Sequence, residues 1–436
     1  MEKMTNIQDL PNKKRVVVIG GGFGGLKIAS KLNPQYFQLV ILDKNNYHQF
    51  QPLLYQVAIA GLEPSSISYP FRKNFQNKKH IQFRMCEATS VIPESKTVET
   101  TIGSITYDYL IIASGCDTNF FGNDSLKEKT IALKSVAEAL YARNTILQCF
   151  EDSTTINDPI ALEKLLTFII VGGGATGVEL AGALADMKKF VLPKDYPEIN
   201  FDHMRIVLID ASKRLLSGMS EHASASASEV LKKRGVEIFQ EVFVTSYEND
   251  IVNLNDGSTF VSKNVIWVAG VAANSLVGFQ KETYGRANRI IVNEYCQIGT
   301  YKDVFALGDT AYMACKKYPN GHPQVAQVAI QMAKLVVENL EKTETNKTPN
   351  AFEYQDKGSL ATIGRNAAVA DLHKLHFGGR IAWLLWLFIH IFIIVGVKNK
   401  VVILLDWAWN YVTYDVSLRL LIRPKLKIPP NNIIPK

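Results

Sequence analysis

The chain alternates between short, wholly apolar runs and longer stretches with helical spacing. The apolar runs include RVVVIG (15–20), FQLVILD (37–43), TFIIVG (167–172), RIVLID (205–210) and VFALGD (304–309). Continuous apolar runs of this length are typical of parallel strands buried on both faces, and the stretches between them are long enough for crossover helices. The pattern therefore predicts an α/β fold.

A glycine loop follows the first apolar run. Gly20, Gly22 and Gly25 have the spacing G-x-G-x-x-G where a strand meets a helical stretch, and Asp43 ends the next strand. Glycine there permits a tight turn and lets a pyrophosphate approach the helix N-terminus, while the acid can accept hydrogen bonds from a ribose. A single loop of this kind could also be an ordinary tight turn of an α/β protein.

The same pattern recurs 152 residues later. Gly172, Gly174 and Gly177 follow a second apolar strand, and RIVLID then ends in Asp210. An acid at this strand end favours NADH, because it would repel a 2′-phosphate. Two such loops in one chain predict two dinucleotides held face to face.

Two further segments agree with this arrangement. The stretch YLIIASGCDTNFFG (109–122) enters a glycine turn at Gly115, which we interpret as the point where the chain leaves the first domain. Asp309 ends an apolar strand and precedes a helical stretch, although an Asp there could simply be a helix cap. The predicted domains are a first dinucleotide domain made of residues 1–121 and 278–370, a second inserted as residues 122–277, and a C-terminal region, residues 371–436.

The C-terminal region contains a 17-residue apolar run from Ile381 to Val397. As one helix it would measure about 26 Å, near the lower limit for crossing a bilayer. Basic residues stand at both of its ends, and a second apolar segment rich in Trp and Tyr follows. A crossing helix leaves its basic excess on one side, so we expect a monotopic segment lying in one leaflet; the length alone leaves a crossing open.

Charge changes this picture only locally. The net charge is +7, and residues 371–436 contain nine basic and three acidic residues, which accounts for +6 of it. A basic, aromatic-rich tail favours an anionic lipid surface over nucleic acid. The five cysteines show no CxxC pair and no metal-binding spacing, and we interpret them as reduced thiols.

Longer motifs resemble a known family. They are NYHQFQPLLYQVAIAGLEP (46–64), GGGATGVELAGALAD (172–186), AQVAIQ (326–331) and VGVKNKVVILLDWAWNYVTYD (395–415). They resemble the type II NADH dehydrogenases, single-subunit NADH:quinone oxidoreductases that carry FAD. The resemblance runs from Arg15 to about Arg423, and it implies two Rossmann-like domains, the second inserted in the first, with a C-terminal membrane-anchoring helical region.

The resemblance also implies site residues. Those expected to bind FAD are Gly20, Gly22, Gly25, Asp43, Gly115, Asp309, Ala326 and Gln327, and those expected to bind NADH are Gly172, Gly174, Gly177, Glu179 and Asp210. Gln327 and Gln331 match the quinone-site signature and, four residues apart on a helix, share one face; without the resemblance they would be interpreted as polar surface residues.

Glu179 is expected in the first turn of its helix, toward the nicotinamide, where an acid could equally serve the helix N-terminus. Glu179, Gln327 and Gln331 are the catalytic candidates. Lys374 is the nearest candidate for a lysine near the quinone, although a solvated or lipid-facing charge explains it as well.

The implied activity is hydride transfer from NADH to FAD, followed by two-electron reduction of a membrane quinone, with menaquinone expected and no proton pumping. Gln327 and its helix N-terminus would stabilise negative charge on the reduced flavin. The expected location is the cytoplasmic face of the cell membrane, and the sequence leaves a homodimer open. Two alternatives are kept: a flavoenzyme similar to the sulfide:quinone oxidoreductases, and a membrane-bound flavoprotein that senses NADH without quinone turnover.

Overall fold

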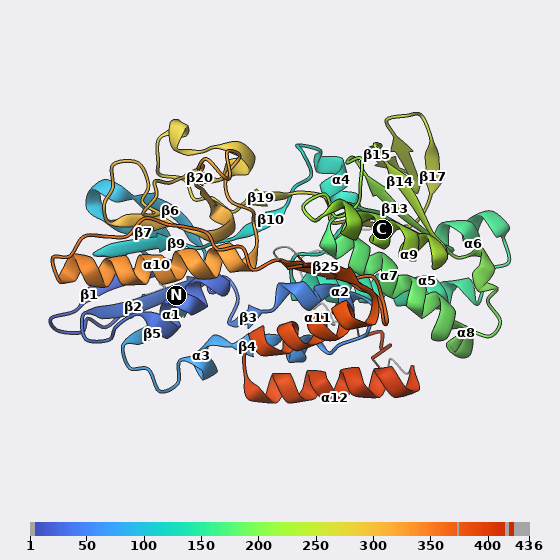
Figure 1. The fold of residues 1–436 in the computed structure, drawn as a ribbon, viewed down its shortest axis with the longest axis horizontal. Helices are drawn as coiled ribbons and strands as arrows, with labels where there is room; N and C mark the ends of the chain where they lie inside the picture. The colour runs from blue at the N-terminus through green and yellow to red at the C-terminus, as the bar shows by residue number, and fades with distance from the viewer. Residues whose placement is uncertain (1–4, 373–374, 415–417, 423–436) are drawn as a thin grey trace, which may run out of the picture.

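The computed structural model describes residues 5–372, 375–414 and 418–422. Two five-stranded parallel sheets lie at opposite ends of an elongated molecule (Figure 1). The first has the order β21-β9-β1-β2-β5, with β1 (Lys14–Ile19), β2 (Phe37–Asp43), β5 (Ile81–Met85), β9 (Tyr109–Ile112) and β21 (Val304–Ala306). The second has the order β11-β18-β12-β13-β14, with β11 (Ile131–Ala132), β12 (Thr167–Val171), β13 (Arg205–Asp210), β14 (Val236–Gln240) and β18 (Asn264–Trp267). The predicted α/β fold with two Rossmann-like domains is confirmed.

The two halves follow the same plan. Each also has a three-stranded antiparallel sheet whose first strand contains a bulge. These sheets are β6 (Ala88–Ile92), β7 (Thr97–Thr100) and β8 (Ile105–Thr106) in the first half, and β15 (Val244–Glu248), β16 (Ile251–Leu254) and β17 (Thr259–Val261) in the second. The second half is therefore an internal structural copy of the first.

The chain crosses between the halves twice, at neighbouring strands. β10 (Cys116–Thr118) leads out of the first half and pairs antiparallel with β19 (Val271–Ala273), which leads back. β21 then joins the edge of the first sheet beside β9. The second half thus lies within the sequence of the first, although the domain limits themselves stay predictions.

Helices cover the sheets, as buried parallel strands require. α1 (Phe23–Lys31) and α10 (Ala326–Glu344) pack together at the first sheet. α5 (Val136–Ser153) and α7 (Ala175–Phe190) contact strands of the second, and α5 begins with a capping box between Ser135 and Glu138. The other elements of the two halves are α2 (Leu54–Ala58), α3 (Phe71–Asn74), α4 (Asp124–Lys129), α6 (Pro159–Leu166), α8 (Leu192–Asp195), α9 (Glu221–Lys233), β3 (Tyr47–Gln49), β4 (Ser68–Pro70), β20 (Ile290–Ile291) and β22 (Ala311–Tyr312).

The C-terminal part comprises an antiparallel sheet and two helices. The sheet is β23 (Ser359–Thr362), β24 (Ala368–Leu372) and β25 (Leu375–Gly378), so the predicted boundary before residue 371 falls inside β24. α11 (Gly379–Ile393) and α12 (Val397–Thr413) follow and lie side by side along the lower edge of the molecule in Figure 1.

The prediction of one helix from Ile381 to Val397 is wrong. α11 ends at Ile393, and Gly396, whose φ is 90°, immediately precedes α12, so the KNK segment lies in the first turn of the second helix. Glycine adopts this positive φ at little cost, which permits the break. Within the described ranges, no helix is long and apolar enough to cross a membrane. Lys374 lies outside the described residues.

Candidate functional site

The first glycine loop leaves a space shaped by backbone. A Cβ on Gly20, whose φ is 103°, would lie 2.3 Å from the carbonyl oxygen of Ala113, and one on Gly25 would lie 2.0 Å from the carbonyl oxygen of Gly20. At Gly22, by contrast, a Cβ would meet no protein atom within 4 Å. Two glycines are thus required by packing, while the middle one opens a space at the N-terminus of α1.

The second loop repeats this geometry. A Cβ on Gly172 would lie 2.7 Å from the backbone nitrogen of Ala269, one on Gly177 would lie 1.8 Å from the Gly172 carbonyl oxygen, and Gly174 faces open space. An open glycine at the start of a helix is what a pyrophosphate needs for close approach to backbone N–H groups. Both loops therefore fit a dinucleotide.

Asp43 and Asp210 hold the loops in the same way. Asp43 accepts hydrogen bonds from the backbone N–H of Gly21 (2.7 Å) and of Asn45 (2.7 Å). Asp210 accepts them from Gly173 and from Ser212. Burial raises the pKa of Asp43, and the backbone N–H groups of Asn45 and Gly21 oppose that rise. Each carboxylate oxygen keeps a second lone pair, which leaves room for the predicted ribose contact.

Gly115 and Asp309 meet at the crossing between the halves. The Gly115 carbonyl accepts hydrogen bonds from the backbone N–H of Asn274 (3.0 Å) and from the Thr310 hydroxyl (3.1 Å). The Cys116 thiol donates to the Asp309 carboxylate at 3.0 Å. Burial, and then the Asp309 charge, raise the pKa of Cys116 to about 12, so this thiol stays protonated and unreactive at neutral pH.

The side chains of Gln327 and Gln331 share one face of α10, as predicted, and grip a neighbouring backbone segment. Gln327 donates to the Gly358 carbonyl (2.9 Å) and accepts from the Lys357 N–H (3.1 Å). Gln331 makes the same pair of bonds with the carbonyl (2.9 Å) and N–H (3.0 Å) of Gln355. Each amide thus bonds to a backbone carbonyl and a backbone N–H, as a neighbouring strand would, and the two amides together fix the segment that leads into β23. Ala326, another predicted site residue, is the first residue of α10.

Glu179 lies at the other end of β23. Its carboxylate accepts a hydrogen bond from the backbone N–H of Thr362 at 3.3 Å, and the residue is buried. Burial raises its pKa to about 8, opposed by the Thr362 backbone N–H, the Trp386 indole and the Thr362 hydroxyl. The prediction that it lies in the first turn of α7 is wrong: it is the fifth residue of a helix that begins at Ala175, so the N-terminus is not its partner.

Sequence reasoning missed the neighbours of Glu179. The Tyr55 hydroxyl lies 3.0 Å from the Thr362 hydroxyl, and the Gln56 amide donates to the Tyr55 oxygen at 2.9 Å. Tyr55 and Gln56 are inside the motif 46–64, but no local pattern distinguishes them from its other polar residues. Their role depends on the contact between Tyr55 and Thr362, which are 307 residues apart in the sequence.

Known protein families and relatives match nearly the whole chain. Residues 14–333 match the pyridine nucleotide-disulphide oxidoreductase family, and residues 357–413 match the NDH2 C-terminal domain. The type II NADH:quinone oxidoreductase Ndh of Mycobacterium tuberculosis is 34% identical over 418 residues, covering 92% of this chain and 89% of the relative. The chain belongs to the type II NADH:quinone oxidoreductases.

Other relatives of this type II NADH:quinone oxidoreductase agree. The enzyme of that name from Haemophilus influenzae is 28% identical over 390 residues, covering 82% of this chain and 87% of the relative. The solved structure of NDH2 from Plasmodium falciparum in complex with NADH matches the fold with a TM-score of 0.86 at 21% identity, covering 94% of this chain and 100% of that one. The predicted family and its activity, NADH:quinone oxidoreduction by a flavin enzyme, are confirmed.

The sulfide:quinone oxidoreductase of Aquifex aeolicus also matches, with a TM-score of 0.72 at 21% identity, over 89% of this chain and 92% of that one. This likeness concerns the fold. The curated relatives place the chain with the NADH enzymes, and the sulfide-oxidising alternative is set aside.

Proposed function

We propose that the first glycine loop holds FAD, that the second holds NADH, and that a membrane quinone, menaquinone, is reduced near the end of β23. The duplicated backbone geometry, with Gly22 and Gly174 both facing open space, supports two dinucleotide sites. The family resemblance supports FAD in the first and NADH in the second. A flavin held by Gly20, Gly22 and Gly25 would supply the redox chemistry, by taking up a hydride from NADH and passing two electrons to the quinone. Mass analysis of the flavin released on denaturation tests the first part: it should be FAD, and FMN would contradict the assignment.

Glu179 is the protonatable group of this site. NADH supplies a hydride and the quinol carries two added hydrogens, so each turnover consumes one proton from the medium. Because burial places its pKa near 8, Glu179 is mostly protonated at neutral pH and can supply that proton. The proton does not cross the membrane in this scheme, so the enzyme does not pump.

Replacement tests this role. Glu179→Gln keeps the hydrogen-bonding shape but cannot titrate, so quinone reduction should slow by about tenfold or more while flavin reduction by NADH persists. Unchanged quinone turnover in this variant would contradict the role of Glu179.

Gln327 and Gln331 position β23. Each amide makes two backbone bonds to the segment that precedes it, and the Gln324 amide also ties the start of α10 to the Asp309 carbonyl at 3.1 Å. α10 and the segment just before it therefore position both Asp309 and β23, the strand that reaches Glu179. Gln331→Leu should lower quinone turnover while flavin content is kept.

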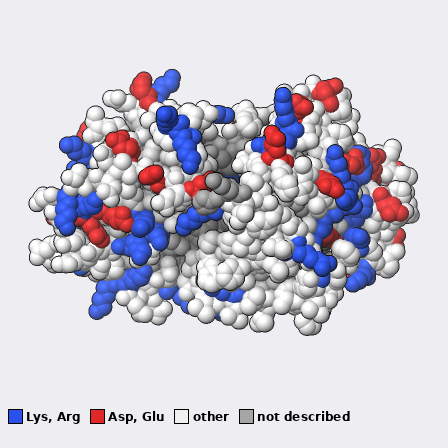
Figure 2. Space-filling model, viewed as in Figure 1, with Lys and Arg blue, Asp and Glu red and all other residues white. Residues whose placement is uncertain are grey.

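The outer sides of α11 and α12 form the membrane contact. They expose apolar side chains at helical spacing, here called the apolar face: Ile381, Leu384, Phe388, Phe392, Val397, Val401, Leu404, Leu405, Trp409 and Val412. Figure 2 shows the surface over these helices as largely uncharged. Arg380 precedes it, and Lys398 and Lys400 lie where α12 begins. An apolar face with basic ends fits monotopic attachment to an anionic lipid surface, on the cytoplasmic face of the membrane where NADH is present.

Vesicle flotation tests this contact. The pair Leu404→Asp and Leu405→Asp should abolish flotation with phosphatidylglycerol vesicles and leave reduction of a water-soluble quinone unchanged; as a matched control, Lys334→Asp on the far helix α10 should still float. If the double variant still floats but changes from dimer to monomer, the apolar face is a subunit interface and the lipid assignment is wrong.

A further inference from the structure

A series of hydrogen bonds runs from α12 to Thr362, the residue whose backbone N–H contacts Glu179. The Trp407 indole N–H donates to the side-chain oxygen of Gln56 at 2.8 Å, and the side-chain NH₂ of Gln56 donates to the Tyr55 hydroxyl oxygen at 2.9 Å. From there the bonds continue to the Thr362 hydroxyl, at 3.0 Å, and the backbone of the same residue reaches Glu179. We call this series the α12–Glu179 chain; its members are Trp407, Gln56, Tyr55, Thr362 and Glu179.

Chemistry fixes the direction of the first two bonds of this chain. An indole N–H can only donate, so the oxygen of the Gln56 amide must face Trp407 and its NH₂ group must face Tyr55. The Tyr55 oxygen thus accepts a bond, and its own hydrogen is free to donate onward to Thr362. Thr362 in turn acts on Glu179: its backbone N–H donates to the carboxylate at 3.3 Å, and both this N–H and the Thr362 hydroxyl lower the pKa of that acid.

Bonds arranged in this way reinforce one another. Each donor is polarised by the bond that it accepts, and the effect grows in a site from which water is excluded. Tyr55, Thr362 and Glu179 are all buried. The Thr362 groups at the end of this series therefore favour the charged form of Glu179, which burial disfavours.

Other groups around Glu179 contribute little charge. Asp186, about two helical turns further along α7, is paired with Arg234 and accepts a hydrogen bond from the backbone N–H of Arg365 at 2.6 Å. From α11, the ring of His390 stacks on Trp386, and burial lowers the pKa of His390 to about 4, so this imidazole is neutral. Tyr55, from α2, is kept neutral because burial raises its pKa far above the ordinary value. The pKa of Glu179 is therefore adjusted by hydrogen bonds to its carboxylate more than by neighbouring charges.

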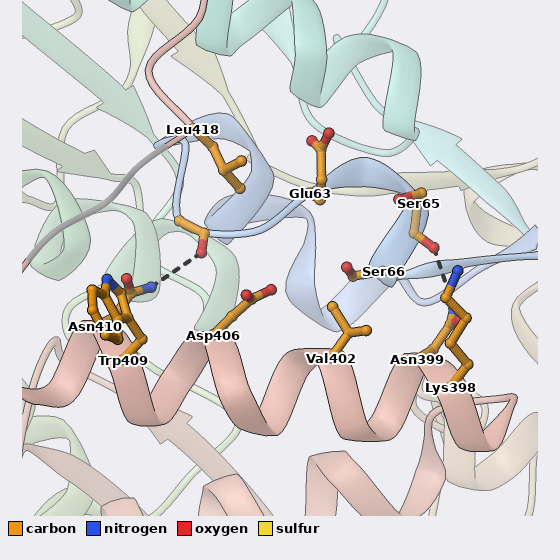
Figure 3. A pocket seen from close by; sticks show the side chains of 11 residues that line it. Glu63, Ser65, Ser66, Lys398, Asn399, Val402, Asp406, Trp409, Asn410 and Leu418 are labelled. Atoms are coloured by element: carbon orange, nitrogen blue, oxygen red, sulfur yellow. Dashed lines mark hydrogen bonds between the residues drawn. The ribbon is translucent and has the colours of Figure 1, made fainter.

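The position of Trp407 depends on how α12 is docked. On its inner side, the Asn399 amide donates to the carbonyl oxygen of Ser65 (3.2 Å) and the Asn410 amide to that of Gly61 (3.4 Å), as Figure 3 shows. At the far end, the Arg365 guanidinium lies 3.6 Å from the centre of the Tyr414 ring. These contacts fix the inner side of the helix whose outer side bears the apolar face.

We propose that the α12–Glu179 chain sets the protonation state of Glu179 from the docked α12, with Trp407, Gln56 and Tyr55 as positioning residues. The inference rests on the proposed role of Glu179 in quinone reduction, and it adds that the membrane-facing helix tunes that role through one indole N–H. Detachment of α12 would withdraw the first donor and leave Glu179 harder to ionise.

Infrared titration of the oxidised enzyme tests this directly. The carbonyl band of protonated Glu179, identified by its loss in Glu179→Gln, gives the titration midpoint without any turnover. Trp407→Phe keeps the ring but lacks the N–H, so the midpoint should rise by about half a pH unit; Tyr55→Phe, nearer the carboxyl, should raise it by about one unit. Trp383→Phe, whose ring stacks on Tyr411 outside the chain, should leave the midpoint unchanged.

The outcomes separate the two proposals. Equal midpoints in wild type, Trp407→Phe and Tyr55→Phe would overturn the inference, and a shift with Tyr55→Phe alone would overturn the link to α12. If the midpoints shift as expected while Glu179→Gln turns over quinone normally, the chain exists and the proposed role of Glu179 is wrong. Flavin content and circular dichroism confirm that each variant is folded.

Discussion

The two glycine loops have the same backbone and different surroundings. In the first, the helix begins with Phe23, whose ring packs edge-on against His48 and Phe50, with ring centres 5.3 and 5.8 Å apart. In the second, the helix begins with Ala175, which is exposed. The carbonyl of Gly21 is bound by the His48 side chain at 3.2 Å, whereas that of Gly173 is bound by the backbone N–H of Leu216 at 2.8 Å.

A second difference lies one turn further along each helix. Seven positions after the first glycine, α1 carries the half-exposed Lys27 and α7 carries the buried Glu179. We interpret the aromatic cover as the feature that retains a resident flavin, and the open loop as suited to a substrate that comes and goes. On the proposed assignment, the glycine motif sets the class of ligand, and the residues around each loop set how long that ligand stays bound and which side chains it contacts.

The largest expected effects come from the third glycine of each loop. Gly25→Ala and Gly177→Ala place a Cβ within about 2 Å of a backbone oxygen, so each loop must deform. Gly25→Ala should purify without flavin, and Gly177→Ala should keep flavin that NADH no longer bleaches. Absorbance spectra measure both, and Gly218→Ala, where a Cβ meets no atom within 4 Å, is the control. Loss of flavin from both variants would break the comparison.

The buried acid that only the second helix carries should affect stability with pH. Burial raises the pKa of Glu179 from 4.5 to about 8, so between these values the folded protein binds a proton that the unfolded chain has released. Stability therefore falls as pH rises through this window. Glu179→Gln should remove that part of the slope, on the order of a few kcal/mol between about pH 5 and pH 9. Denaturant unfolding at a series of pH values gives the unfolding free energy of wild type and of Glu179→Gln. The same pH dependence in both proteins would contradict the burial argument.

His48 should make the first loop sensitive to acid. Burial lowers the pKa of His48 from 6.5 to about 4. The stability that the folded protein gains from keeping His48 neutral is therefore complete above pH 6.5 and is lost as the pH falls toward 4. Over this pH range the wild-type protein should release flavin more readily, because flavin binding weakens by about 1–2 kcal/mol. The loss should be smaller in His48→Asn, whose amide can still donate to the Gly21 carbonyl. Fluorescence of released flavin measures this, and NADH affinity at the second loop should not follow the same pH dependence.

The smallest expected effect comes from the acid of the second loop. Asp210→Asn keeps only one of the two side-chain oxygens that accept hydrogen bonds from the backbone N–H groups of Gly173 and Ser212. This loss should weaken NADH binding by about 1 kcal/mol, or roughly fivefold in KM. Loss of the charge should also narrow the preference for NADH over NADPH. Asp43→Asn is the matched change in the first loop and should leave the KM for NADH unaltered; a reduced preference in this variant instead would reverse the assignment of the loops.

Local patterns were sufficient to predict the two halves. The apolar runs, the glycine spacing and the terminal acids each depend on neighbours in sequence, and the structure has them where the pattern places them. Gln327 and Gln331 also share a face because helical spacing requires it. The misjudged helix end at Ile393 came from treating Gly396 as one small residue in an apolar run, although its positive φ separates two helices.

Long-range contacts were beyond the sequence. Three sets of hydrogen bonds join residues that no local sequence pattern connects. They are the bonds of Gln327 and Gln331 to the segment 355–358, the bond of the Cys116 thiol to Asp309, and the bond between Tyr55 and Thr362. Burial of Glu179 behind Thr362 likewise arises from β23, which the sequence pattern did not connect with α7. The chemistry of this site comes from these tertiary contacts.

The most direct test of the account is anaerobic stopped-flow absorbance of the flavin in Gly174→Ala and Gly22→Ala. Both glycines have φ and ψ that alanine adopts, and a Cβ at either meets no protein atom within 4 Å, so each change should obstruct only a ligand. Gly174→Ala should keep its flavin, require at least about tenfold more NADH for bleaching, and be reoxidised by quinone at the wild-type rate, while Gly22→Ala should bind flavin weakly. A wild-type NADH dependence in Gly174→Ala would contradict the division of the two loops between flavin and NADH.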